Sequence, residues 1–183
     1  MGTKTEKYVA FLRGINVGGH HKVPMAELRQ QLGVLNLENV VTLLNSGNII
    51  FETTIDDADQ LEELVSNHLQ EHFGFPIPTI VRKATTIEQI FEANPFEGIT
   101  VTKDTRLYIS FLKMDVAADL TLPWTSPDTS YQIIQKEGKN ILSVLDLSIS
   151  KTPKAMDTLE KTYGKGITTR NWKTIERIMK KLL

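Results

Sequence analysis

The sequence predicts an α+β protein built from two related subdomains, the first with a ferredoxin-like βαββαβ arrangement. Short apolar runs rich in β-branched and aromatic residues alternate with amphipathic segments of helical period over residues 8–81. A similar but less regular alternation returns after residue 105. A short helical piece (87–91) and the Asn94-Pro95-Phe96 turn lie between them. The expected domains are therefore 1–84 and 106–183, with 85–105 as the connecting segment.

The first subdomain is expected to contain four strands and two helices. Tyr8–Leu12 (YVAFL) is a continuous apolar, β-prone run, which indicates a buried strand. A helix should begin at Pro24, because proline at the first helical position loses no hydrogen bond. The other expected elements are strands 40–44 and 49–51 around a compact turn at 45–48, an acid-started helix 56–73 closed by Gly74, and a strand 77–81.

This order of elements places two polar loops together. In βαββαβ topology the first two strands run in the same direction, with the third antiparallel between them. The loop after the first strand, RGINVGGHHKVP (Arg13–Pro24), should therefore lie beside the Ser46-Gly47-Asn48 turn. The Gly74-Phe75-Pro76 turn should lie at the same end of the sheet.

The second subdomain is expected to be a degraded copy of the first, followed by a C-terminal helix. Alternating apolar residues predict a strand at 107–111, and a weak helix is expected at 115–120. Strands 131–135 and 141–145 should form a hairpin around Glu137-Gly138. Helices are expected at 153–163 and 171–182.

Composition and charge narrow the function classes. The 183-residue chain has no cysteine, which excludes disulfides, thiolate metal sites and cysteine nucleophiles. A net charge of −1 argues against a general polyanion binder. Residues 150–183 nevertheless carry nine bases against three acids. This is either a solvated helix face or a basic face for an anionic partner.

The N-terminal sequence has no apolar run long enough for a signal peptide or a membrane span. We therefore expect a cytoplasmic protein with no membrane partner. The sequence leaves the oligomeric state open.

The Arg13–Pro24 loop is the first candidate site. Gly14 and Gly19 have the separation found in a nucleotide P-loop, but His20 and His21 stand where that motif needs lysine and a hydroxyl residue. The dinucleotide fingerprint G-x-G-x-x-G is also absent. Backbone N–H groups freed by glycine, the Arg13 guanidinium and a nearby helix N-terminus could still bind an anion. The alternative is a tight structural turn.

Two histidine patterns are weaker candidates. His68 and His72 form H-x-x-E-H, the inverted zinc-protease pattern, but they share a helix face with core leucines and have no third ligand on that helix. We therefore expect no metal site. His20 and His21 could supply a base near neutral pH, or they could simply be solvated.

The segment Thr168–Trp172 (TTRNW) is expected to open the last helix. Thr169 or Asn171 would serve as its N-cap, and Trp172 would start a buried stripe. Arg170 has no such explanation, because a positive side chain opposes the dipole at a helix N-terminus. We therefore treat Arg170 as a second candidate anion contact.

Four segments of this sequence resemble, in the same order, the signatures of one bacterial domain-of-unknown-function family. They are YVAFLRGINVGGHHKVPMAEL (8–28), NSGNIIF (45–51), NPF (94–96) and TTRNWKTI (168–175). The resemblance implies an α+β fold of two related subdomains, with no established activity or cofactor. The matching positions are Arg13, Gly14, Asn16, Gly18, Gly19, Lys22, Ser46, Gly47, Asn48, Arg170, Asn171 and Trp172.

The hypothesis from sequence is a protein that binds a small phosphorylated or carboxylated metabolite or a nucleotide, without a cofactor. The alternatives are an enzyme acting on such a ligand, or a nucleic-acid or protein interaction domain. Nucleic acid is the less favoured partner, because the strands lack the aromatic pattern that stacks RNA bases. The expected ligand-binding residues, with the last two forming a second wall of one cleft, are Arg13, Gly14, Asn16, Gly18, Gly19, Lys22, Ser46, Asn48, Arg170 and Asn171.

Overall fold

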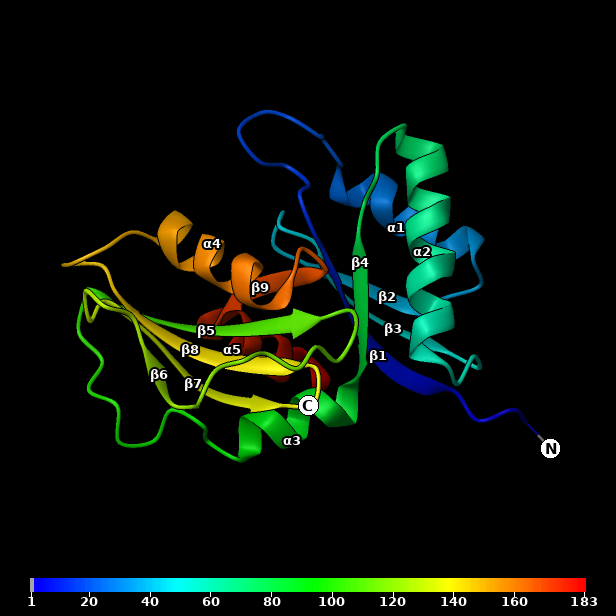
Figure 1. Cartoon of the computed structure of the whole chain (residues 1–183). Helices are drawn as coiled ribbons and strands as arrows, with labels where there is room; N and C mark the ends of the chain where they lie inside the picture. The colour runs from blue at the N-terminus through cyan, green and yellow to red at the C-terminus, as the bar shows by residue number, and fades with distance from the viewer. Residues whose placement is uncertain (1) are drawn as a thin grey trace. The chain divides into compact units, whose positions relative to one another are not determined.

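A computed structural model of the chain describes residues 2–183. The chain forms two compact units (Figure 1). The first unit runs to Glu92 and also includes Arg177–Leu183, and the second comprises Ala93–Glu176. The boundary between them therefore passes through the last helix.

The first unit has the ferredoxin-like arrangement that the sequence predicts. Its four-stranded sheet has the order β2-β3-β1-β4, and every neighbouring pair is antiparallel. The first two strands therefore run in the same direction with β3 between them. The elements are β1 (Glu6–Leu12), α1 (Met25–Val34), β2 (Glu38–Leu43), β3 (Asn48–Thr53), α2 (Ala58–Phe73), β4 (Thr79–Lys83) and α3 (Ala84–Glu92).

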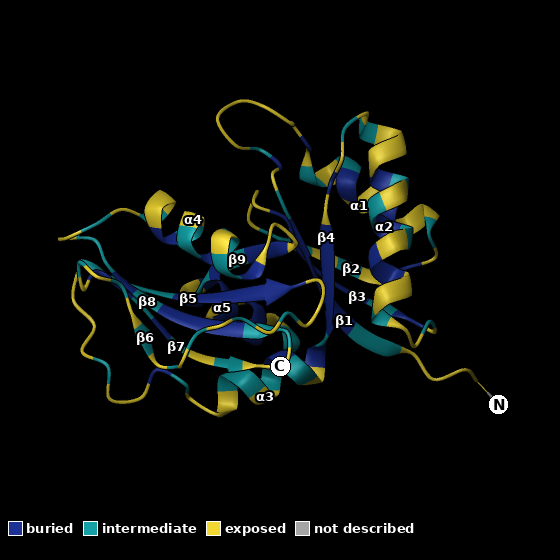
Figure 2. Cartoon of the chain, in the orientation of Figure 1, coloured by how far each residue is buried: buried dark blue, intermediate teal, exposed yellow. Residues whose placement is uncertain are grey.

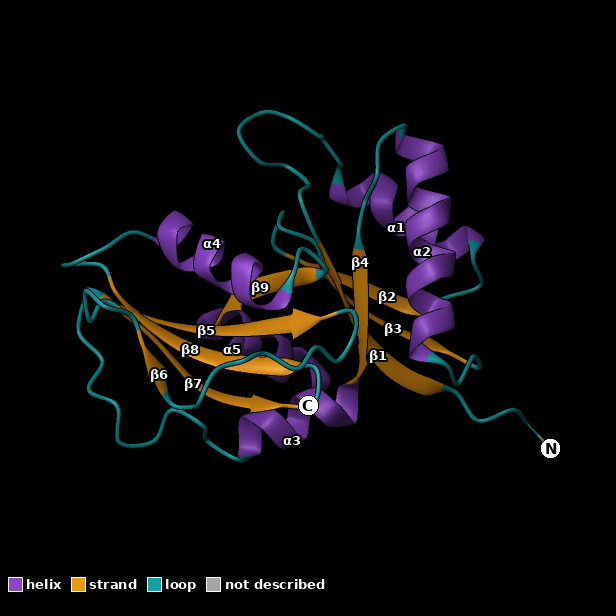
Figure 3. Cartoon of the chain, viewed as in Figure 1, coloured by secondary structure: helices purple, strands orange, loops and turns teal. Residues whose placement is uncertain are grey.

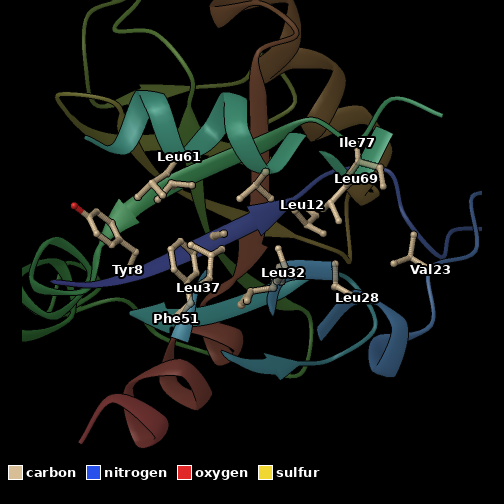
Figure 4. Close-up of a cluster of buried hydrophobic side chains, with 14 of the residues drawn as sticks. Tyr8, Leu12, Val23, Leu28, Leu32, Leu37, Phe51, Leu61, Leu69 and Ile77 are labelled. Atoms are coloured by element: carbon tan, nitrogen blue, oxygen red, sulfur yellow. The ribbon is translucent and has the colours of Figure 1, made fainter. Parts of the chain in front are cut away.

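Both α1 and α2 pack on one face of this sheet (Figures 3 and 4). Leu28 and Leu32 of α1 and Leu61 of α2 are buried against alternate residues of the central strands, among them Tyr8 and Phe51. Removing this apolar surface from water is the main favourable term for the unit. Antiparallel pairing with β3 and β4 sets the direction of β1, and so sets the end of the sheet from which its following loop emerges.

A buried carboxylate ties α2 to β4. The Glu62 Oε1 atom accepts the backbone N–H of Val81 at 3.0 Å and lies 3.8 Å from the Arg82 Nη1 atom. At the ends of α2, the Asp57 side chain caps the N-terminus and Gly74 adopts a left-handed conformation, φ 84°. The predicted glycine stop of this helix is confirmed.

The second unit repeats the strand order of the first. Its sheet has the order β6-β7-β8-β5-β9, in which β7-β8-β5-β9 matches β2-β3-β1-β4. One helix, α4, packs on the sheet with Leu159 and Tyr163 in the core. The elements are β5 (Thr105–Leu112), β6 (Trp124–Thr125), β7 (Tyr131–Glu137), β8 (Asn140–Asp146), α4 (Thr152–Tyr163), β9 (Ile167–Asn171) and α5 (Trp172–Leu182).

The helix expected at 115–120 is wrong. This segment is irregular and precedes the short strand β6, and its Leu120 packs against the core of the unit. Asp115 accepts a hydrogen bond from the Lys136 ammonium group on β7, at 2.6 Å. Six residues form too few helical hydrogen bonds to offset the cost of helix nucleation, so these tertiary contacts decide the conformation.

The two short strands β6 and β9 were not predicted from the sequence. Thr168, Thr169 and Arg170 were expected to lead into the last helix, but they belong to β9, which pairs with β5. The helix itself begins at Trp172. The residues described include no helix with the length and apolar character needed to cross a lipid bilayer.

Candidate functional site

The turn between β2 and β3 spans residues 44–47, close to the 45–48 expected from the sequence. It lies beside the Arg13–Pro24 loop at the carboxyl end of β1, as predicted. The backbone N–H of Leu12 donates to the Gly47 carbonyl oxygen at 2.8 Å, and that of Arg13 donates to the Pro78 carbonyl oxygen at 2.9 Å. The His21 ring stacks on Phe75 with their centroids 4.3 Å apart. The Gly74-Phe75-Pro76 turn is therefore at the same end, as the topology requires.

Asn16 holds the loop together through its side chain. Its Nδ2 atom donates to the carbonyl oxygens of Val23 (3.0 Å) and Asn45 (2.8 Å), and its Oδ1 atom accepts the N–H of Val23 at 2.8 Å. Its backbone has φ 55°, a left-handed conformation that asparagine tolerates better than most residues. Both amide hydrogens are thus donated within the chain, which is a structural role.

Asn48 and Ser46 similarly close the β2–β3 turn. Asn48 is fully buried, and its Nδ2 atom donates to the Leu43 carbonyl oxygen at 2.9 Å and to the Ser46 Oγ atom at 3.1 Å. The side chain satisfies a backbone acceptor that the tight turn would otherwise leave unpaired. The geometry therefore accounts for Asn48 without a ligand.

The glycines of this region fall into two kinds. A Cβ atom at Gly47 would lie 2.7 Å from the Leu12 Cβ atom, so close packing requires glycine there. Gly14 and Gly19 also have positive φ, 77° and 76°, but a Cβ atom at either would meet nothing within 4 Å. The loop itself is exposed over most of its length (Figure 2). Packing therefore explains Gly47 but does not explain the loop glycines.

A cavity of about 370 Å³ opens beside the loop. Lys22 contributes a charged side chain to its lining, and Val23, Pro24 and Met25 contribute apolar atoms. Helix α1 begins after Pro24, whose side chain makes no hydrogen bond to the first N–H groups of the helix. The complete lining is Asn16, Gly19, Lys22, Val23, Pro24, Met25 and Asn45.

Three of the four histidines, His21, His68 and His72, have structural partners. The Nδ1 atom of His21 lies 3.2 Å from the Gly14 carbonyl oxygen. Since a carbonyl oxygen only accepts, this nitrogen carries the proton. In the H-x-x-E-H segment, the Nε2 atoms of His68 and His72 bond to Gln31 and Glu27 of α1, at 2.9 and 2.7 Å.

No group of three or more His, Asp or Glu side chains is placed to hold a metal ion within residues 2–183.

Arg170 and Asn171 lie on β9 of the second unit. The Arg170 side chain is buried, and its Nη1 atom donates to the Thr168 hydroxyl at 2.8 Å and the Thr169 carbonyl oxygen at 3.0 Å. Burial lowers the pKa of Arg170 to about 10. The argument that Arg170 opposes a helix dipole is wrong, because pairing with β5 places it inside a strand. That it shares a cleft with Arg13 stays a prediction.

Comparison with known proteins places the chain in a family. The family model described as "Protein of unknown function (DUF1697)" matches residues 5–141, more than half of the sequence. The chain belongs to this family. No curated protein matches. Among solved structures, the conserved bacterial protein SP0830 from Streptococcus pneumoniae is similar, with 26% identity and a TM-score of 0.68 over 98% of this chain and 100% of that one.

The DUF1697 match covers one part of the predicted site and not the other. Residues 5–141 include the Arg13–Pro24 loop and the 44–48 turn, whereas β9 with Arg170 and Asn171 lies beyond them. The predicted resemblance to a bacterial family of unknown function is confirmed. Membership of the DUF1697 family assigns no ligand.

Sequence reasoning missed a second cavity, in the second unit. It has a volume of about 450 Å³ and is lined by residues of two separate segments. The one part of this cavity that the sequence marks is the TTRNW segment, because its Asn171 and Trp172 belong to the cavity lining. The other lining segment, 101–107, carries no motif, and only the pairing of β5 with β9 brings the two segments together.

Proposed function

We propose that this protein binds a small anionic metabolite, a phosphate or carboxylate with an apolar portion, at the cavity beside the Arg13–Pro24 loop. The loop glycines carry this proposal. Gly14, Gly18 and Gly19 all have positive φ, and the nearest atom to a Cβ at any of them would be 4.0 Å away. Their conformation exposes backbone N–H groups without serving internal packing, which suits close approach by a ligand.

The charge at the cavity favours an anion. Lys22 is exposed at the rim and makes no ion pair with any of the residues described, 2–183. The first turn of α1 adds unpaired N–H groups and the positive end of the helix dipole. A phosphate or carboxylate placed there would gain charge-assisted hydrogen bonds from both sources.

The apolar part of the cavity lining favours a ligand with an apolar portion. Val23, Pro24 and Met25 make up this part. The volume of about 370 Å³ lies at the small end of the range for ligand pockets, roughly 300–1,000 Å³. A metabolite such as a sugar phosphate or a short carboxylic acid fits this size better than a dinucleotide.

Thermal denaturation with a ligand panel tests the proposal. The panel would contain inorganic phosphate, citrate and sugar phosphates. A ligand at a hundred times its dissociation constant stabilises the folded state by about 2.7 kcal/mol, which raises Tm by several degrees in a chain of this size. Lys22→Gln should keep the Tm of the free protein and lose most of this ligand-dependent rise.

A matched pair of glycine variants separates binding from backbone strain. Gly19 and Gly98 have similar φ values, 76° and 80°, and both would place a Cβ atom in open space. Gly19→Ala and Gly98→Ala should therefore lower the Tm of the free protein by similar amounts. Only Gly19→Ala should reduce the rise in Tm that the ligand causes. A ligand response that survives both Lys22→Gln and Gly19→Ala would overturn the proposal.

A further inference from the structure

The second cavity is lined by cationic side chains that make no ion pair with a carboxylate of residues 2–183. Lys103, Arg106 and Lys173 line it, together with a single acid, Glu176. None of the three cations makes an ion pair across the part of the chain that the structure describes, residues 2–183. The Arg106 Nη1 atom donates instead to the carbonyl oxygens of Lys103 (2.8 Å) and Thr105 (3.0 Å).

Other lysines of the same unit behave differently. Lys136, Lys154 and Lys161 each lie 2.6–2.8 Å from an aspartate oxygen. Some cations of the unit are therefore neutralised elsewhere on its surface, whereas the cations at the cavity give its lining a net positive charge. Like charges around a common hollow repel each other, and an anion placed among them would relieve that repulsion.

Asn171 gives the cavity a polar donor, and Trp172, 8% exposed, adds an aromatic surface. The Asn171 Oδ1 atom accepts the backbone N–H of Lys173 at 3.0 Å, and its Nδ2 atom has no hydrogen-bond partner within residues 2–183. The Trp172 ring packs edge-on against Phe96, with centroids 5.0 Å apart, which fixes its orientation. Val101, 59% exposed, adds a solvent-facing apolar surface.

We propose that this cavity is a second ligand site, separate from the glycine loop, for a small organic phosphate or carboxylate that carries a flat ring. The cations would hold the anionic group, Asn171 would donate to a polar atom, and Trp172 would contact the ring. Its volume of about 450 Å³ suits a ligand the size of a nucleoside monophosphate. Charge alone would attract any anion, whereas Trp172 makes the ring part of the recognition.

The indole N–H resonance of Trp172 can report ligand binding at this cavity. The chain has two tryptophans, and Trp124→Phe identifies which indole signal in a ¹H–¹⁵N spectrum belongs to Trp172. AMP should shift this signal saturably. Inorganic phosphate, which lacks the ring, and adenosine, which lacks the charge, should each bind at least about tenfold more weakly.

Charge variants locate the binding. The double variant Lys103→Gln, Lys173→Gln should weaken AMP binding about tenfold or more, whereas Lys113→Gln should leave it unchanged. Lys113 is an exposed lysine of the same unit that lies outside the cavity lining. Lys22→Gln should also leave the Trp172 response unchanged, which separates this site from the glycine loop.

Two results would overturn the inference. One is a Trp172 signal that AMP and an aromatic carboxylate such as benzoate both fail to move at 100-fold molar excess. The other is binding that weakens equally in Lys113→Gln and in the double variant, which would indicate a general charge effect. Equal binding of phosphate and AMP would remove the ring from the proposal and contradict it in its stated form.

Discussion

The carbonyl oxygen of Gly47 accepts the backbone N–H of Leu12 at 2.8 Å, and a Cβ atom at position 47 would lie only 2.7 Å from the Leu12 Cβ atom. The hydrogen bond brings the 44–47 turn so close to the end of β1 that no side chain fits between them. The same Cβ atom would also lie only 2.9 Å from the Ile15 Cδ1 atom.

Gly47→Ala should therefore be one of the more damaging small substitutions in the first unit. The methyl group meets two buried side chains, and the residue must also keep φ 86°. Overpacking and the positive φ together should cost about 3 kcal/mol in the free energy of unfolding. Denaturant unfolding measures this cost. Gly98→Ala, which has a positive φ but open space, should cost about 1 kcal/mol, and equal costs would contradict the packing argument.

Asn16→Ala should destabilise the loop without affecting the sheet. It removes three hydrogen bonds, two to Val23 and one to the Asn45 carbonyl oxygen. The expected loss is about 2–4 kcal/mol in the free energy of unfolding, or local opening of the loop at lower cost. Hydrogen exchange at the amide of Val23, which now donates to the Asn16 Oδ1 atom, should become faster.

Asn45→Ala is the control for Asn16→Ala. Asn45 is exposed, and within residues 2–183 it bonds to the loop only through its backbone carbonyl oxygen, which alanine keeps. This variant should change neither the unfolding free energy nor the exchange of Val23. If both variants behave alike, the Asn16 side chain does not hold the loop.

The sequence predicted the position of this loop because local patterns determine it. A continuous apolar run gives β1, an amphipathic helix closed by glycine gives α2, and the βαββαβ order then places the two turns together. The role of Asn16 could not be predicted in the same way. It depends on the carbonyl oxygen of Asn45, 29 residues away, and several polar residues of the loop could have faced that atom.

The second unit was harder to predict for the same physical reason. Strand β9 is short and polar, and it exists because Thr168–Asn171 pairs with β5, about sixty residues earlier. Without that pairing, the segment has the local pattern of a helix cap, and Arg170 looks exposed. The same pairing sets Asn171 beside Lys103 and Arg106 in the cavity lining. The loop candidates came from local patterns, whereas the second cavity required the long-range pairing.

Glu62→Gln should weaken the attachment of α2 to β4. It preserves an oxygen that can accept the Val81 N–H but removes the negative charge 3.8 Å from the buried Arg82 guanidinium. Burial already lowers the pKa of Arg82, and the charge of Glu62 opposes that effect. Loss of one member of a buried ion pair should cost about 3 kcal/mol in the free energy of unfolding.

A double variant distinguishes this cost from a simple loss of packing. Adding Arg82→Met to Glu62→Gln removes the buried charge and should recover part of the lost stability, since an apolar side chain of similar length tolerates this environment. The comparison requires denaturant unfolding of both single variants and the double variant. If the two single effects simply add, the ion pair contributes nothing.

Asp128→Asn should destabilise the second unit in a pH-dependent way. The Lys154 ammonium group and the Ser130 and Ser126 hydroxyls, at 2.6–2.8 Å, hold the pKa of Asp128 well below its ordinary value. A carboxylate whose pKa is depressed by folding stabilises the protein above its unfolded pKa, about 3.9, and this stabilisation is lost as pH falls toward the folded pKa. The Tm difference between wild type and Asp128→Asn should therefore be largest near pH 7 and shrink below about pH 4.

Asp119→Asn is the control. It removes an exposed carboxylate of the same unit that has no hydrogen bond within residues 2–183, and it should change Tm little at either pH. A Tm difference for Asp128→Asn that stays constant from pH 7 to pH 3 would mean that the variant acts through packing of the 126–130 turn and not through the charge.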